Sequence, residues 1–247
     1  MALVRHNTGN GHYYVLDGER ADGVTTLIGE GLPPRLEKWA AEKTANYALD
    51  HWDELTQLPL SERHAALLGA RWADKNRAAS QGTAVHTLGR ALAAGTEVEV
   101  PDYLDGYVRS YVSFLDDWEP QPELIEAVVG NRAVGYAGTL DLLAKVGNER
   151  WLFDIKTGSG VYGDTALQLA AYGFAEFYLD AEGVERAMTP PDRCAVVHVQ
   201  PGHYSVYPLP FDAEVFKIFR HVAFVARSKP TIRFWVGSEV KPEAAKS

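Results

Sequence analysis

Two acids and a lysine stand in the segment 138–172 at spacings that could do chemistry. Asp141 lies on the apolar run LDLLAKV and Asp154 on the run RWLFDIKT. The turn signal Gly147-Asn148 separates the two runs, so we expect antiparallel strands that bring the carboxylates together. The alternation of a strand sends Lys156 to the same face as Asp154. The sequence therefore predicts a patch that holds two acids and an ammonium group.

Such a patch suits a hard divalent cation. Like charges a few ångströms apart raise the pKa of one carboxyl strongly, and a cation removes this conflict. Mg²⁺ takes carboxylates, waters and phosphate oxygens, and the Ile155 carbonyl would add another oxygen. Lys156 would then hold or activate a water and offset charge on a phosphoryl group. The chemistry that this suggests is metal-assisted phosphodiester hydrolysis, although charged residues alternate on many surface strands without a function.

Two further pairs of residues have helical spacing. Gln168 and Tyr172 are i,i+4 neighbours on an expected helix, where a buried pair satisfying each other's hydrogen bonds would also explain them. Gly82 and His86 have the same spacing further upstream, with Arg90 one turn beyond. A lone helical histidine is more often structural, so its role depends on what faces it.

Taken together, these motifs resemble the RecB-type branch of the PD-(D/E)XK nuclease superfamily, which includes CRISPR-associated RecB-like exonucleases and many phage exonucleases. The resemblance is strongest over residues 80–172 and implies a restriction-endonuclease-like core with one or two Mg²⁺ or Mn²⁺ ions. It also implies that Lys156 is catalytic and that Gln168 and Tyr172 support the site and contact DNA. The metal ligands that it implies are His86, Asp141 and Asp154 with the Ile155 carbonyl, and Glu126 stands where family members often carry an acid.

The departures from the family pattern concern one proline and the cysteines. Leu140 replaces the proline that names the superfamily, a change that RecB-type members tolerate. The chain has one cysteine, Cys194, which excludes an internal disulfide and a four-cysteine cluster. We therefore expect no iron–sulfur cluster and place Cys194 in a core strand.

Charge is distributed unevenly along a chain whose formal net charge is -9. Residues 61–96 carry +3, residues 97–126 carry -8 and residues 215–233 carry +5. Two basic segments suit DNA bound at a local site, for instance a single strand or an end threaded through a channel, although solvated helix faces explain the charges equally well. The candidate DNA-binding residues are Arg71, Lys75, Arg77 and Arg90, together with Gln168 and Tyr172.

The chain lacks the features of a secreted or membrane protein. No signal-peptide pattern opens it, and no apolar stretch approaches the ~20 residues of a membrane helix. We expect a cytoplasmic protein without a membrane partner, located in the host cytoplasm if it is phage-encoded, with a possible recombination or helicase partner.

The fold class that we expect is α/β, with a mixed central sheet flanked by helices and an N-terminal helical region. We expect one compact domain overall: a mainly helical region over residues 1–120 lining the site, a nuclease core over 121–235 and a flexible tail over 236–247. The expected strands are His12 to Leu16, Leu124 to Val129, Arg132 to Tyr136, the two acid-bearing runs, Arg193 to Gln200 and Tyr204 to Leu209. The expected helices are 23–28, 33–49, Leu60 to Ala78, Ser80 to Ala94, Pro101 to Trp118, Asp164 to Leu179 and Ala213 to Arg227.

The function expected from these features is a metal-dependent DNA exonuclease of recombination, repair or phage DNA metabolism. An endonuclease or nickase would use the same site, because the motif determines the chemistry and not the need for an end. A noncatalytic DNA-binding assembly subunit and a structural protein that shares only the fold are the other interpretations.

Overall fold

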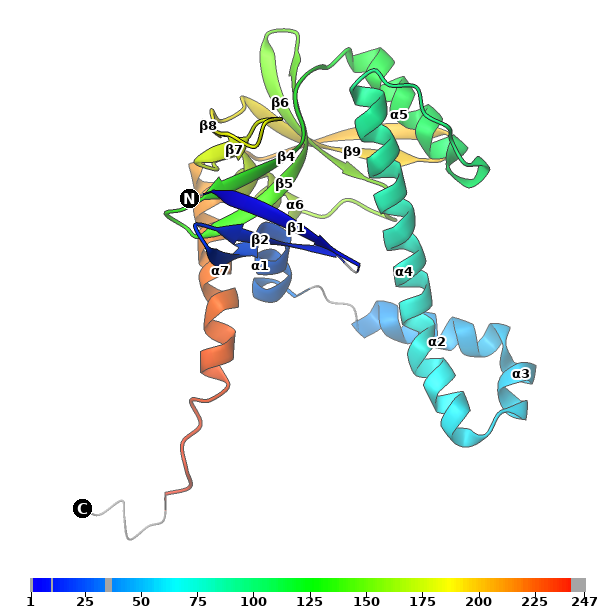
Figure 1. The fold of residues 1–247 in the computed structure, drawn as a ribbon. Coiled ribbons are helices and arrows are strands. Elements are labelled where there is room, and N and C mark those ends of the chain that lie inside the picture. The colour runs from blue at the N-terminus through cyan, green and yellow to red at the C-terminus, as the bar shows by residue number, and fades with distance from the viewer. Residues whose placement is uncertain (1, 10, 34–36, 241–247) are drawn as a thin grey trace.

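The computed structural model describes residues 2–9, 11–33 and 37–240, and shows an α/β architecture in which a curled mixed sheet is flanked by helices (Figure 1). The predicted fold class is confirmed. The predicted flexible tail falls largely on residues 241–247, which lie outside the described residues.

The sheet forks at β5 (Tyr136–Val146). The start of β5 pairs in parallel with β3 (Glu19–Gly23), and from Leu142 onward it pairs antiparallel with β6 (Glu149–Lys156). Between these two pairings, residues 138–141 border the opening that holds the site. On one side the sheet continues through β4 (Gln121–Asn131), β7 (Phe177–Leu179) and β8 (Glu185–Ala187), and beyond β6 it continues through β9 (Arg193–Gln200) and β10 (His203–Leu209).

The hairpin that was expected to unite the two acids is present. Its register pairs Leu142 with Phe153 and Val146 with Glu149, and Gly147 turns the chain at a φ of 59°. This φ lies in the left-handed region that glycine adopts readily, which is why Gly-Asn is an effective hairpin turn. The predicted strands β9 and β10 around Pro201-Gly202 are also confirmed.

The strand predicted from Arg132 to Tyr136 is wrong. Residues 132–135 form the turn between β4 and β5, because the Asn131 side chain accepts the Val134 N–H at 2.8 Å and its carbonyl accepts the Gly135 N–H. An asparagine that bonds to the backbone in this way favours a turn over a strand. β4 is correspondingly longer than the predicted Leu124 to Val129.

Helices cover both faces of the sheet. On one face, α1 (Val24–Gly31), α6 (Thr165–Gly173) and α7 (Ala213–Ile232) share a buried core with β5 and β6. On the other, α5 (Asp105–Trp118), preceded by the 3-10 turn η1 (Asp102–Leu104), packs on β9 and β10. Burial of these apolar faces is the main force that holds the layers together.

The helix predicted from Asp164 to Leu179 is too long. α6 ends at Gly173, where a side chain would collide with the Phe211 ring, since an added Cβ would lie 2.6 Å from it. The chain then runs as β7, in which Phe177 and Tyr178 pair with β4. Aromatic residues in a short run favour a strand when the edge of a sheet is available for pairing.

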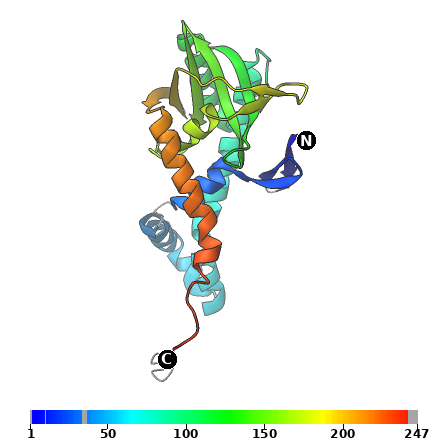
Figure 2. The same ribbon diagram turned by 90° about the vertical axis from the view of Figure 1, so that its left-hand side faces the viewer.

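One helix replaces the two predicted from Leu60 to Ala78 and from Ser80 to Ala94. α4 (Leu60–Ala93) is continuous over 34 residues, because an alanine-rich sequence has no proline to interrupt it. Its C-terminal half lies beside the sheet, while its N-terminal half extends away from the sheet and packs against α2 (Glu37–Asp50), which is followed by α3 (Trp52–Gln57) (Figures 1 and 2).

The N-terminal region is not purely helical. β1 (Leu3–Thr8), β2 (Gly11–Leu16) and β3 form an antiparallel meander that joins the main sheet at β5. The strand expected over His12 to Leu16 thus finds partners on both sides. None of the helices in the described part of the chain is sufficiently long and apolar to cross a membrane.

Candidate functional site

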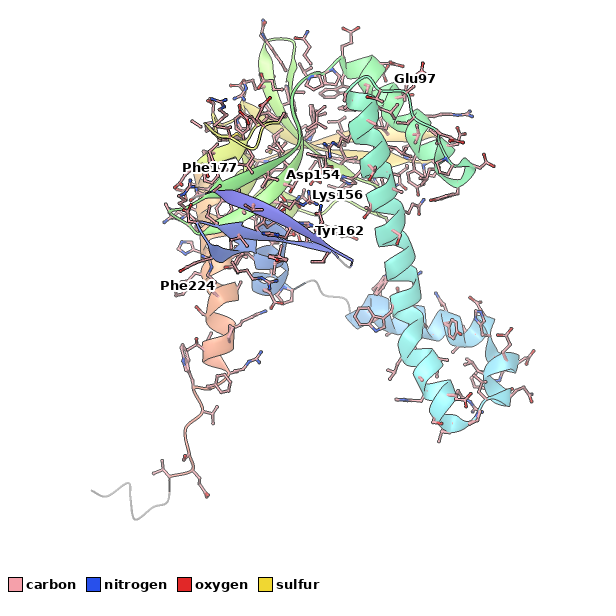
Figure 3. All side chains as sticks on the ribbon, viewed as in Figure 1. Glu97, Asp154, Lys156, Tyr162, Phe177 and Phe224 are labelled. Carbon is pink, nitrogen blue, oxygen red and sulfur yellow. The ribbon has the colours of Figure 1, made fainter. Side chains whose placement is uncertain are left out.

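The candidate site lies at the fork of the sheet. A cavity of about 630 Å³ opens there, lined by residues of β1 to β6, α1, α4 and α6. Figure 3 shows Asp154 and Lys156 beside this opening, between the N-terminal strands and α4. The fork matters because a sheet edge without a neighbouring strand leaves room for a ligand beside β5.

Three potential metal ligands converge at one side of this cavity. The Nδ1 atom of His86 on α4 lies 3.6 Å from Glu126 Oε1 and 3.6 Å from Asp141 Oδ1. One ligand atom from each residue lies within 4.8 Å of the others. The second Asp141 oxygen accepts the Ile155 backbone N–H at 2.7 Å, so β6 orients this carboxylate. His86, Glu126 and Asp141 are called the ligand triad below.

Glu126 has a strained backbone. Its φ is 50°, a left-handed conformation in the middle of β4, while Ile125 and Ala127 on either side pair normally with β5. Non-glycine residues in such conformations cost on the order of 1–3 kcal/mol and concentrate at functional sites. At this distortion the Glu126 carboxylate lies near His86 and Asp141, while the residues on either side keep their pairing with β5.

Asp154 occupies a second acidic position, next to the triad but engaged with other groups. It is 2% exposed, and its Oδ1 accepts hydrogen bonds from Lys156 Nζ at 3.0 Å and Gln168 Nε2 at 2.7 Å. Its Oδ2 lies 2.8 Å from the same ammonium and accepts no further hydrogen bond from the residues that the structure describes. Lys156 thus balances the buried charge of Asp154 on the shared strand face that the sequence predicted.

Tyr172 of α6 lines the cavity beside β5. Its buried ring lies against the backbone of Gly138, where any side chain would clash with the ring. Burial raises the pKa of the Tyr172 phenol well above its ordinary value, so the group stays neutral. Gly138 is therefore required by the close approach of α6 to β5 and not by a turn.

Burial and neighbouring charges shift the pKa values of Asp141 and His86. Burial raises the pKa of Asp141 to about 7, and the charge of Asp154 adds to this shift. Burial alone would lower the pKa of His86, but the carboxylates of Asp141 and Glu126 outweigh it and raise the pKa to about 9. Burial opposes the charge of Lys156 as well, and Asp154 again reverses the effect and raises its pKa. Cation binding would relieve the repulsion between these acids.

Most of the site residues that the sequence predicted line one cavity. The structure brings His86, Asp141, Asp154, Lys156, Gln168 and Tyr172 to one cavity, and Ile155 reaches it through the N–H bonded to Asp141. The ligand triad includes Glu126, which the sequence marked only weakly, whereas Asp154 pairs with Lys156 and Gln168.

Among the predicted DNA-binding residues, Arg90 is exposed on α4 near His86. The side chains of Arg71, Lys75 and Arg77, also on α4, lie outside what the structure describes.

Sequence reasoning missed the N-terminal wall of the cavity. Arg5 and His12 of β1 and β2 line it, together with Tyr14, whose hydroxyl bonds to Thr139 Oγ1 at 2.8 Å. The alternation in residues 12–16 indicated a strand, but nothing in the sequence indicated that the strand borders β5.

Comparisons with known proteins add little to this geometry. No protein-family model matches the chain, and no curated protein matches it. A solved structure described as "Crystal structure of SSO0001" is similar at 14% sequence identity, over 85% of this chain and 75% of that chain, with a TM-score of 0.32. A likeness at this level carries no argument about function.

Proposed function

We propose that this protein is a metal-dependent DNA nuclease of the PD-(D/E)XK type, and an exonuclease in particular. The observation that carries the proposal is the convergence of the ligand triad beside the buried Asp154 and Lys156 pair. Two carboxylates and an imidazole suit Mn²⁺, and the carboxylates suit Mg²⁺. The raised pKa values of Asp141 and His86 suit a site that holds a cation, because the acids repel each other without one.

Each residue has a chemical role in this proposal. A bound divalent cation supplies Lewis-acid polarisation of a phosphate oxygen and lowers the pKa of a water. Asp141 is held by the Ile155 N–H so that Oδ1 faces His86. Lys156 places a positive charge at the edge of the cavity, where it stabilises negative charge that develops on a phosphoryl group. Gln168 fixes Asp154, and thereby the position of Lys156.

The alternatives differ in what they require of this site. An endonuclease or nickase would cut closed circles with the same residues. A noncatalytic assembly subunit would bind DNA but has no chemical need for the triad and the lysine together. The strained Glu126 favours a catalytic or metal-binding role over a structural one, since a solvated acidic face needs no such distortion.

End-labelled linear DNA, single- and double-stranded, and closed circles should be incubated with Mg²⁺ or Mn²⁺. We expect the wild type to digest linear DNA, and Asp141→Ala and Lys156→Ala to lose this activity by a factor of about 10² or more. The matched controls are Asp116→Ala and Lys145→Ala, which remove exposed charges from α5 and from the far end of β5. Digestion that persists in both site variants would refute the proposed site, and DNA binding by a wild type that digests nothing would favour the assembly subunit.

A further inference from the structure

Arg5 on β1 reaches the cavity with an incompletely satisfied guanidinium. Its Nη1 donates to Thr139 Oγ1 at 3.4 Å, and its Nη2 lies 3.4 Å from His12 Nδ1. Its Nε is buried, and no described protein atom accepts a hydrogen bond from it. A buried N–H without an acceptor is costly, and such a group in a native cavity calls for a reason.

Arg5 also lacks a counter-ion. Other arginines around the sheet pair with carboxylates, among them Arg132 with Asp17 and Arg150 with Glu123. In the described part of the chain, no acid forms an ion pair with Arg5. Burial, together with the charge of Arg5, lowers the pKa of His12, so this neighbour is neutral near pH 7. The guanidinium therefore lines the polar cavity without a direct ion-pair partner among the described residues.

A network of hydrogen bonds surrounds Arg5 in this position. The register of β1 and β2 pairs Arg5 with Tyr14, which is 4% exposed. The Tyr14 hydroxyl lies 2.8 Å from Thr139 Oγ1 and 3.0 Å from His12 Nε2, the two residues that also contact Arg5. Thr139 is two residues from Asp141 on β5, so the network connects the guanidinium to the strand that carries the triad. An arginine that is fixed before its ligand arrives loses little entropy on binding.

We propose that Arg5 is the phosphate-binding residue of this cavity and takes non-bridging oxygens of a phosphate group on the DNA strand. The inference rests on the proposed function and extends it to one substrate contact. A guanidinium matches a phosphate with two parallel N–H donors, an arrangement stronger than neutral hydrogen bonds. The acids of the site repel a phosphate, whereas Arg5 attracts it to the N-terminal wall of the same cavity.

The test is DNA binding without cleavage. The fluorescence anisotropy of a labelled single-stranded oligonucleotide in Ca²⁺ measures its affinity, and a denaturing gel verifies that it stays intact. Three forms of the oligonucleotide carry a 5′-phosphate, a 3′-phosphate or neither. The variants are Arg5→Met and Arg5→Lys, with Arg193→Met as a control that removes an exposed arginine paired with Glu149.

We expect Arg5→Met to bind about 10- to 100-fold more weakly than the wild type, and Arg5→Lys to recover part of the loss. Arg193→Met should bind within about 2-fold of the wild type, since exposed ion pairs contribute little. The midpoint of thermal unfolding of Arg5→Met should equal or exceed that of the wild type, because an unsatisfied buried N–H is removed.

If Arg5→Met binds all three oligonucleotides more weakly than the wild type does, Arg5 contacts a backbone phosphate. If it binds only one phosphorylated form more weakly, Arg5 contacts that terminal phosphate. Wild-type affinity in Arg5→Met, an equal loss in Arg193→Met, or a midpoint lowered in proportion to the lost affinity overturns the inference. The digestion assay on the wild type tests the proposed nuclease function separately. If the wild type digests DNA but Arg5→Met binds DNA with wild-type affinity, the phosphate contact is rejected while the nuclease function is retained.

Discussion

Replacing Asp141 by asparagine should stabilise the metal-free protein and abolish its response to metal. The carboxyl is 13% exposed, and burial together with the charge of Asp154 raises its pKa from an ordinary value of 3.8 to about 7. A group whose pKa is raised on folding contributes stability at low pH that is lost as pH rises through the folded value. Above pH 7 the ionised Asp141 therefore destabilises the fold unless a cation is bound.

The magnitude follows from the shift in pKa. Each pKa unit corresponds to about 1.4 kcal/mol, so raising the pKa from 3.8 to about 7 makes the ionisation of Asp141 cost on the order of 4 kcal/mol at pH 8. Solvent reaches this partly exposed carboxyl and screens part of the cost, so we expect a net gain of about 2 kcal/mol. In a protein of this size such a gain raises the midpoint of thermal unfolding by roughly 4–8 °C.

Thermal melts in EDTA at pH 8 and pH 5, followed by circular dichroism, measure this effect. Asp141→Asn should melt above the wild type at pH 8, and the gap should narrow at pH 5, where the wild-type carboxyl is protonated. Saturating Mn²⁺ should reverse the order, because a ligand at 100 times its Kd adds about 2.7 kcal/mol to the wild type alone. A variant that melts below the wild type in EDTA at pH 8, while Asp116→Asn does not, would refute the account of a repulsive, cation-ready site.

Two further predictions concern the same residues. Mn²⁺ affinity should increase with pH between about 6 and 9, because the cation displaces protons from Asp141, with a pKa of about 7, and from His86, with a pKa of about 9. Calorimetric titration in buffers of different ionisation enthalpy counts the released protons. An affinity that does not change with pH would contradict this prediction. Gly138→Ala should lower the free energy of unfolding by about 1–3 kcal/mol through its clash with Tyr172, whereas Gly82→Ala, whose methyl would lie 3.4 Å from Thr157 in ordinary contact, should not; equal urea midpoints would disprove the packing argument.

The sequence predicted the parts of the site that depend on local rules. A glycine turn between alternating runs is sufficient to place Asp141 and Asp154 on adjacent strands, and strand alternation is sufficient to put Lys156 beside Asp154. Helical spacing likewise placed Gln168 and Tyr172 on one side of α6. These features involve neighbours within one hairpin or one helix, so the periodicity of the backbone determines them.

The parts that the sequence could not supply depend on distant segments. The left-handed backbone of Glu126 is not visible in a run of strand residues, so its carboxylate could be assigned only by family resemblance. The absence of a side chain at Gly173, the last residue of α6, matches the close approach of Phe211, which follows almost forty residues later. Arg5 enters the cavity only because β3 joins β5 in parallel, a long-range pairing that no local pattern reports.

The metal site that we propose consists of His86, Glu126 and Asp141. Titration of Mn²⁺ into metal-free protein, followed by the loss of the electron paramagnetic resonance signal of the free ion, tests it most directly. The wild type should bind one or two ions. Asp141→Asn should lose at least one of them, Glu126→Gln should bind at least one of them tenfold or more weakly, and Asp116→Asn should bind as the wild type does. Unchanged Mn²⁺ binding in both triad variants, or no binding by the wild type, would contradict the account.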